Sequence, residues 1–184
     1  AVDKWHIDTI GFDYVMMVSD PNQQVGGRFQ YFLGTKKEIQ EIKDNNQSIP
    51  EDRIISPEFP GPGYIIVMQG NMVVHRGAKL EQPFDRVTMV NGYVPLDLES
   101  VDPSHFSDLK TVDPHQLLFP EWARHKAWLS KGKLNQIIEE LPFTDDRELI
   151  INKLKSAIKD VETAIKDISD TSEGEQNFYG DLEK

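Results

Sequence analysis

The chain has 184 residues, contains no cysteine and carries a formal net charge of −11 at pH 7. Because an acidic protein repels the phosphate backbone, these values argue against a nucleic-acid partner. No apolar run approaches the roughly 20 residues that a membrane span needs, and the N-terminus lacks the pattern of a signal peptide. The absence of cysteine excludes a disulfide framework and thiolate chemistry, and we expect a cytoplasmic protein that does not bind membranes.

The first predicted strand places a histidine and a carboxylate close to the N-terminus. His6 and Asp8 are separated by one residue, and side chains at i and i+2 of an extended strand project from the same face. The two groups can therefore hold one ion between them. The pair alone is equally typical of an ordinary strand end at the surface, so a third ligand has to come from elsewhere in the chain.

Two further strands are predicted over residues 14–18 and 28–33. The second of these alternates, which places Arg28 on one face and Tyr31 on the other. Arg28 is a candidate for binding an anionic group of a substrate, and its alternative role is that of an exposed cation on a strand. Tyr31 is a second candidate substrate-binding residue.

A short helix is predicted to begin after Thr35, because Thr35 and Glu38 have the spacing of a capping box. The segment from Asp44 to Asp52 is polar and is expected to form a loop. A helix inserted between strands in this way is a candidate wall for a substrate pocket.

A hairpin is predicted to deliver the third ligand. Strands over residues 64–69 and 72–75 flank Gly70-Asn71, a turn sequence of the two-residue type. His75 ends the return strand and is a candidate metal ligand, whereas Arg76, the next residue, is expected to point the other way into solvent. The closing strand is predicted over residues 86–93, with Arg86 and Thr88 on one face.

The ordered set His6-x-Asp8, His75 and Arg86-x-Thr88 resembles the Fe(II)- and 2-oxoglutarate-dependent dioxygenase superfamily over roughly residues 4–95. The resemblance implies a double-stranded β-helix jelly roll. It also implies that His6, Asp8 and His75 bind Fe(II) as a facial triad. Arg86 and Thr88 would then bind the distal carboxylate of 2-oxoglutarate, and O₂ would be the co-substrate.

The resemblance further predicts oxidation of a C–H bond, by hydroxylation, desaturation or ring formation, in a small anionic substrate. Two alternatives remain open. One is a jelly-roll module in which a metal is structural or absent, and the other is a cupin-type metalloenzyme that does not use 2-oxoglutarate. Because the family places a core strand and helices before the His-x-Asp strand, we expect the chain to be the C-terminal part of a longer protein.

Residues 96–169 are predicted to form a helical extension of the core in residues 1–95, which makes the protein α+β overall. Residues 96–114 read as an acidic loop, followed by helices over 115–129, 133–141 and 145–168. The last helix carries a heptad pattern of six aliphatic residues, which another surface must cover. We expect Ile158 and Val161 to be buried within the chain, and a homodimer through this helix is the alternative. Asp145 is its predicted N-cap, and residues 170–184 are expected to form a mobile acidic tail.

Overall fold

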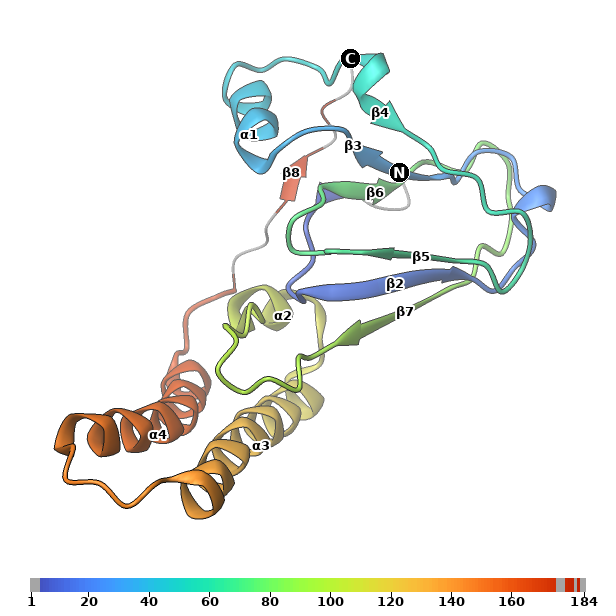
Figure 1. Cartoon of the computed structure of the whole chain (residues 1–184). Helices are drawn as coiled ribbons and strands as arrows, with labels where there is room; N and C mark the ends of the chain where they lie inside the picture. Colours follow the sequence, from blue (N-terminus) through green and yellow to red (C-terminus); the bar gives the residue numbers. More distant parts are fainter. Residues whose placement is uncertain (1–3, 175–177, 181, 183–184) are drawn as a thin grey trace. The chain divides into compact units, whose positions relative to one another are not determined.

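A computed structural model of the chain describes residues 4–174, 178–180 and 182 (Figure 1). The protein divides into two compact units. The first unit contains the residues up to Val94, Asp102–Ser104 and the described residues after position 177. The second contains Pro95–Val101 and the described residues from His105 onward, up to residue 174.

Two antiparallel sheets form the first unit. The five-stranded sheet has the order β4-β3-β6-β1-β8, with the bounds Ile54–Ile55, Phe29–Phe32, His75–Gly77, Trp5–His6 and Phe178–Gly180. The three-stranded sheet has the order β5-β2-β7, with the bounds Ile65–Met68, Phe12–Met17 and Thr88–Tyr93. Neither sheet closes on itself over the described part of the chain.

The two sheets pack against each other through alternating side chains. In β2 the buried positions are Asp13, Val15 and Met17, which share one face of the strand. Val15 belongs to a core cluster that joins Met68 of the small sheet to Phe29 of the large one. The metal-ligand candidates of the large sheet therefore face the inner side of β2.

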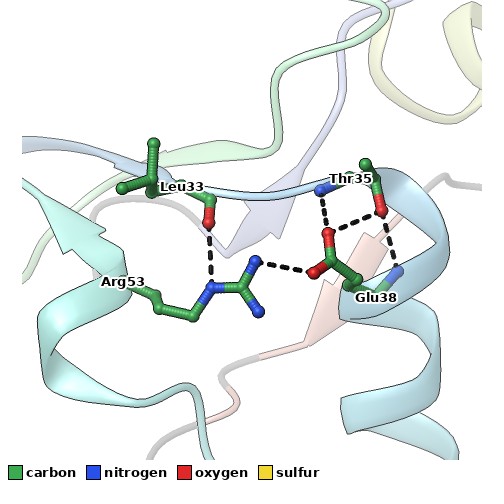
Figure 2. Close-up of polar contacts among 4 residues, drawn as sticks. All are labelled: Leu33, Thr35, Glu38 and Arg53. Atoms are coloured by element: carbon green, nitrogen blue, oxygen red, sulfur yellow. Dashed lines mark hydrogen bonds and ion pairs between the residues drawn. The ribbon is translucent and has the colours of Figure 1, made fainter.

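Helix α1 (Lys36–Asp44) packs over a second core cluster of the first unit. The predicted capping box is confirmed, because the Thr35 hydroxyl accepts from the Glu38 amide and the Glu38 carboxylate accepts from the Thr35 amide. Glu38 also pairs with Arg53 at 2.9 Å, and Arg53 donates to the Leu33 carbonyl (Figure 2). These contacts tie the start of α1 to the segment that leads into β4.

Its hydrogen bonds favour the charged form of the Glu38 carboxylate. Hydrogen bonds from the Thr35 backbone and hydroxyl, together with Arg53, lower the pKa of Glu38 to about 2.

Two short 3₁₀ helices, Pro21–Gln23 and Glu51–Arg53, occupy loops of the same unit.

The second unit is helical and consists of α2 (Phe106–Val112), α3 (His115–Glu140) and α4 (Arg147–Ser169). Phe106, Leu118, Trp122 and Ala164 form its core. Helices α3 and α4 are further linked by Lys133 and Asp160, which pair at 2.7 Å. The predicted α+β class, with helices at the C-terminal side of the strands, is confirmed.

Several predicted elements of the first unit need correction. Residues 64–69 and 72–75 do not form a hairpin, because β5 pairs with β2 whereas β6 pairs with β1 and β3. The turn after Gly70 instead carries the chain from one sheet to the other. The physical reason is that Val74 is buried in the cluster beneath α1, whereas Met68 is buried between the sheets.

The helical region also differs from its prediction. Residues 106–112 form α2 within the predicted loop, because Phe106 and Leu109 pack into the helical core. The two helices predicted over 115–129 and 133–141 are one, because Gly132 at the predicted break continues the helix, at a cost of only about 1 kcal/mol relative to alanine. The N-cap of α4 is Asp146, which accepts from the Leu149 amide, and not Asp145.

The predicted mobile tail lies partly outside the described residues, and three of its described residues form a strand of the large sheet. Residues 178–180 form β8 and pair with β1. Tyr179 packs against the cluster of Trp5, Phe32 and Ile39, so apolar burial fixes a segment whose composition is mainly acidic.

Among the described helices, none has the length and apolarity that a membrane crossing requires.

Candidate metal centre

His6 and His75 are direct cross-strand partners on β1 and β6. Residues opposite each other in an antiparallel pair project from the same face of the sheet. Their ring centroids are 4.4 Å apart, and Phe29 lies 5.6 Å from the His75 ring on its other neighbouring strand. Strand pairing therefore brings together two imidazoles that are 69 positions apart in sequence.

Both imidazoles are oriented by a backbone carbonyl two residues earlier in the chain. Nδ1 of His6 lies 2.7 Å from the Lys4 oxygen, and Nδ1 of His75 lies 2.8 Å from the Val73 oxygen. A carbonyl only accepts, so Nδ1 carries the proton in each ring. In the neutral imidazole, Nε2 then has a free lone pair, which is the form that binds metals.

Asp8 faces the Nε2 atoms of both histidines. Its Oδ1 is 3.5 Å from His6 Nε2, and its Oδ2 is 3.4 Å from His75 Nε2. One donor atom from each of the three residues lies within 4.8 Å of the other two. Ligands about 2.1 Å from a metal and at right angles to each other are about 3 Å apart, so this group could hold a metal ion.

The surroundings of Asp8 favour the charged form of its carboxylate. Burial by itself raises the pKa of Asp8, but hydrogen bonding with His6 and the charge of His75 outweigh this effect and lower it to about 2. Asp8 is fixed through its backbone as well, because its amide donates to the Gly70 carbonyl at 2.9 Å. A negative ligand is thus available at neutral pH.

Gly70 leaves the space in which two carboxyl groups meet. A Cβ at this position would overlap Oδ2 of Asp13 and would lie 2.7 Å from Oδ2 of Asp8. Both side chains therefore depend on glycine at position 70. Gly70 and Asn71 do form a turn, closed by the Met72 amide donating to the Gln69 carbonyl at 2.8 Å, but this turn joins two sheets and not the two strands of a hairpin.

Asp13 is a fully buried carboxyl beside the metal-ligand group. It is 1% exposed, and neither of its oxygens meets an N–H or hydroxyl donor among the described residues. Its hydrogen bond is with the Asp8 carboxyl, which requires one of the two groups to carry a proton. Burial, this hydrogen bond and the charge of Asp8 raise the pKa of Asp13 to about 8.

One pocket of about 310 Å³ joins the triad to the other predicted site residues. Its lining comprises His6, Asp8 and His75, the candidate cofactor ligands Arg86 and Thr88, and Val15, Phe29, Arg76, Gly77 and Val90. Arg86 is half-buried and its Nε donates to the Gly27 carbonyl at 2.8 Å. The five residues of the sequence motif thus line a single pocket.

The two candidate substrate residues lie elsewhere. Arg28 lines a second pocket of about 200 Å³, which shares Phe29 with the first. Tyr31 is the cross-strand partner of His75 and packs against the core cluster between the sheets. Neither residue is among those that line the pocket of the triad.

Arg76 was expected in solvent and is buried instead. Its guanidinium lies 4.5 Å from the centre of the Trp5 ring and donates twice to Gln30 Oε1. Sequence reasoning also missed Asp13, which precedes the predicted strand 14–18 and belongs to a residue type that is mostly exposed. Both residues became recognisable only once the strand pairing was known.

No family model matches the chain, and neither the curated proteins nor the solved structures include a match.

Proposed function

We propose that this protein is a non-haem Fe(II)- and 2-oxoglutarate-dependent oxygenase that oxidises a C–H bond of a small anionic substrate. The observation that carries the proposal is the convergence of His6, Asp8 and His75 on one point, in a pocket that Arg86 and Thr88 also line. Two imidazole nitrogens and one carboxylate oxygen are the donor set of the facial triad.

The orientation of the donors supports a metal ligand role. Each imidazole has its Nδ1 proton bonded to a backbone carbonyl, so each Nε2 faces Asp8 and offers a lone pair when the ring is neutral. Without a cation, each Nε2 can satisfy the Asp8 carboxylate only by carrying a proton of its own, and this protonated form is the one that lowers the pKa of Asp8. His6, Asp8 and His75 would hold a divalent ion in place of these protons, as the positive partner of the carboxylate.

Arg86 and Thr88 would anchor the co-substrate. Guanidinium presents two parallel N–H groups that match a carboxylate, and a hydroxyl two residues further along can bond the same group. The Gly27 carbonyl holds Arg86 Nε and so fixes the direction of the fork. The position of Arg86 favours a site that binds a dicarboxylate over a purely structural metal site. A structural metal site does not need an arginine in its pocket.

When bound, Fe(II) with 2-oxoglutarate and O₂ supplies the oxidising power needed to break a C–H bond. The protein's own residues position the reactants and exclude water from the pocket. Val15, Phe29 and Val90 give the pocket an apolar wall, and a low-dielectric wall strengthens each charge interaction made inside it.

We further propose a jelly roll as the finer description of the first unit. Successive strands pass between two facing antiparallel sheets, as β1 to β2, β2 to β3, β4 to β5, β5 to β6 and β6 to β7 each change sheet. This connectivity is typical of a double-sheet jelly roll. The second pocket, with Arg28 at its lining, is then the place for an anionic part of the substrate.

The test is 2-oxoglutarate turnover. Purified protein with Fe(II), O₂ and ascorbate should convert 2-oxoglutarate to succinate and CO₂, at least slowly, even without the primary substrate. His75→Ala should abolish this turnover, whereas His105→Ala on the second unit should leave it unchanged. Turnover that is absent under all substrate mixtures would favour a metal-binding module, and oxygen uptake without 2-oxoglutarate would favour a cupin-type enzyme.

A further inference from the structure

Helix α4 leaves most of its apolar stripe uncovered. Five aliphatic side chains at alternating spacings of three and four residues are between 40% and 62% exposed, namely Ile151, Leu154, Ile158, Val161 and Ile165. The prediction that Ile158 and Val161 are buried within the chain is therefore wrong. A continuous aliphatic stripe of this length on a helix surface is unusual unless another surface covers it.

The reason is that α4 packs on α3 through a different face. Ala157 and Ala164 are buried, and Asp160 and Asp167 bond to Lys133 and Trp122 of α3. At 100° per residue these positions lie about 100° around the helix from the stripe. Small alanines let the two helices approach closely, and the larger aliphatic residues point to one side of the pair.

The stripe is symmetric about its own centre. If a second copy of α4 runs antiparallel to the first, with the two-fold axis passing between Lys159 and Asp160, Ile158 of one copy lies opposite Val161 of the other. Leu154 then lies opposite Ile165. Each of these layers then pairs an a position with a d position, as antiparallel coiled helices require. The outermost layer would join Ile151 to Ile168, which is partly buried against the helical core.

The charges beside the stripe have the same symmetry. Lys155 and Glu162 are exposed on the flank away from α3, and among the described residues of their own chain neither makes a hydrogen bond or ion pair. In the antiparallel register, Lys155 of one copy faces Glu162 of the other, and the pair occurs twice. In a parallel register, Lys155 and Glu162 would face the flank of Ile150 and Ala157 and would find no opposite charge.

We infer that α4 is the interface of a homodimer in which the α4 helices of two copies pack antiparallel through Ile158, Val161, Leu154 and Ile165. The two copies then share an isologous contact, which a two-fold axis requires. Helices α3 of both copies flank the contact, so the assembly is a four-helix bundle. This inference is independent of the proposed oxygenase activity.

A charge-reversal cycle tests the register. Lys155→Glu and Glu162→Lys should each weaken the dimer by roughly tenfold or more, since each replaces two opposite-charge pairs by two like-charge pairs. The double variant should restore the wild-type dissociation constant. Lys131→Glu, an exposed lysine on α3, makes the same charge change outside the stripe and should have no effect. Sedimentation velocity over a range of concentrations gives the constants.

Apolar variants test the stripe itself. Ile158→Asp should give a monomer with an unchanged far-ultraviolet circular dichroism spectrum, because Ile158 contributes little to the helical core. Ile138→Asp changes a residue that is 80% exposed on α3 and should leave the dimer intact. Wild-type protein that stays monomeric at all concentrations would overturn the inference and would indicate that another part of the same chain covers the stripe.

Cysteine crosslinking tests the orientation, because the natural chain has no cysteine. A mixture of the Leu154→Cys and Ile165→Cys proteins should form a disulfide-linked heterodimer under mild oxidation. Neither protein alone should crosslink, since in the antiparallel dimer its own cysteines are about 16 Å apart along the helix. Efficient crosslinking of Leu154→Cys alone would indicate a parallel pair and would contradict the proposed register.

Discussion

His6 and His75 face each other across adjacent strands, each with its Nδ1 atom bonded to the carbonyl of the residue two positions before it. This shared arrangement directs both Nε2 atoms toward Asp8. A backbone carbonyl therefore holds the Nδ1 proton of each ring. Such an orientation is already in place before any ion binds, which lowers the entropic cost of forming a metal site.

Gly70→Ala should reduce metal affinity without unfolding the protein. The added Cβ would overlap Asp13 and crowd Asp8, so the carboxylate has to leave its position between the histidines. We expect a loss of roughly tenfold to a hundredfold in affinity, the range seen when the support of a metal ligand is disturbed. Isothermal titration calorimetry with Fe(II) or Co(II) measures it.

Gly61→Ala is the matched control for this substitution, because a Cβ at position 61 would meet no atom within 4 Å. It should bind metal as the wild type does. Equal affinities for the Gly70→Ala, Gly61→Ala and wild-type proteins would show that Asp8 is not held in place by the space at Gly70.

Asp13→Asn should change how stability depends on pH in the metal-free protein. The pKa of Asp13 is raised from 3.8 to about 8, so between these values the folded state retains a proton that the unfolded chain has lost. Stability must therefore fall as pH rises through this window, by up to about 1.4 kcal/mol per pH unit. Asparagine donates a hydrogen bond without titrating and should abolish the fall.

Chemical denaturation at several pH values, with a chelator present, checks this expectation. The stability of Asp13→Asn relative to the wild type should increase from about pH 4 to about pH 8 and then stay level. A difference that is constant across the window would mean that Asp13 does not hold its proton in the folded state.

Arg86→Lys should raise the concentration of 2-oxoglutarate needed for half-maximal turnover. Lysine offers one point charge where the proposed role needs a two-pronged donor, and a lost charge-assisted bond costs roughly 1.5–3 kcal/mol. Steady-state kinetics with varied 2-oxoglutarate measures the effect. Arg28→Lys, in the other pocket, should leave the 2-oxoglutarate requirement unchanged, and an unchanged requirement for Arg86→Lys would make Arg86 an ordinary structural residue.

The sequence was sufficient to find residues whose relation is local or whose spacing is distinctive. His6 and Asp8 share a face because they are two residues apart, and the capping box of Thr35 and Glu38 depends only on local geometry. His75 was identified correctly as the third member of the group, but for the wrong local reason, because β6 pairs with β1 and β3 and not with β5.

The features that sequence reasoning missed depend on contacts between distant segments. Asp13 looks like a surface residue until the pairing of β2 buries it beside Asp8. Strand alternation predicts that Arg76 points into solvent. The contact between its guanidinium and the Trp5 ring depends on how the strands pair, which the local sequence does not determine. On α4 the heptad pattern was clear, but which face meets α3 is decided by the small residues Ala157 and Ala164.

Fe(II) binding by the triad is the central claim, and anaerobic calorimetric titration tests it most directly. The wild-type protein should bind one Fe(II) per chain, and Asp8→Ala and His75→Ala should each lose that binding, while His105→Ala should retain it. Far-ultraviolet circular dichroism establishes that all the variants are folded. Fe(II) binding of wild-type strength in Asp8→Ala or His75→Ala would contradict the assignment of this site.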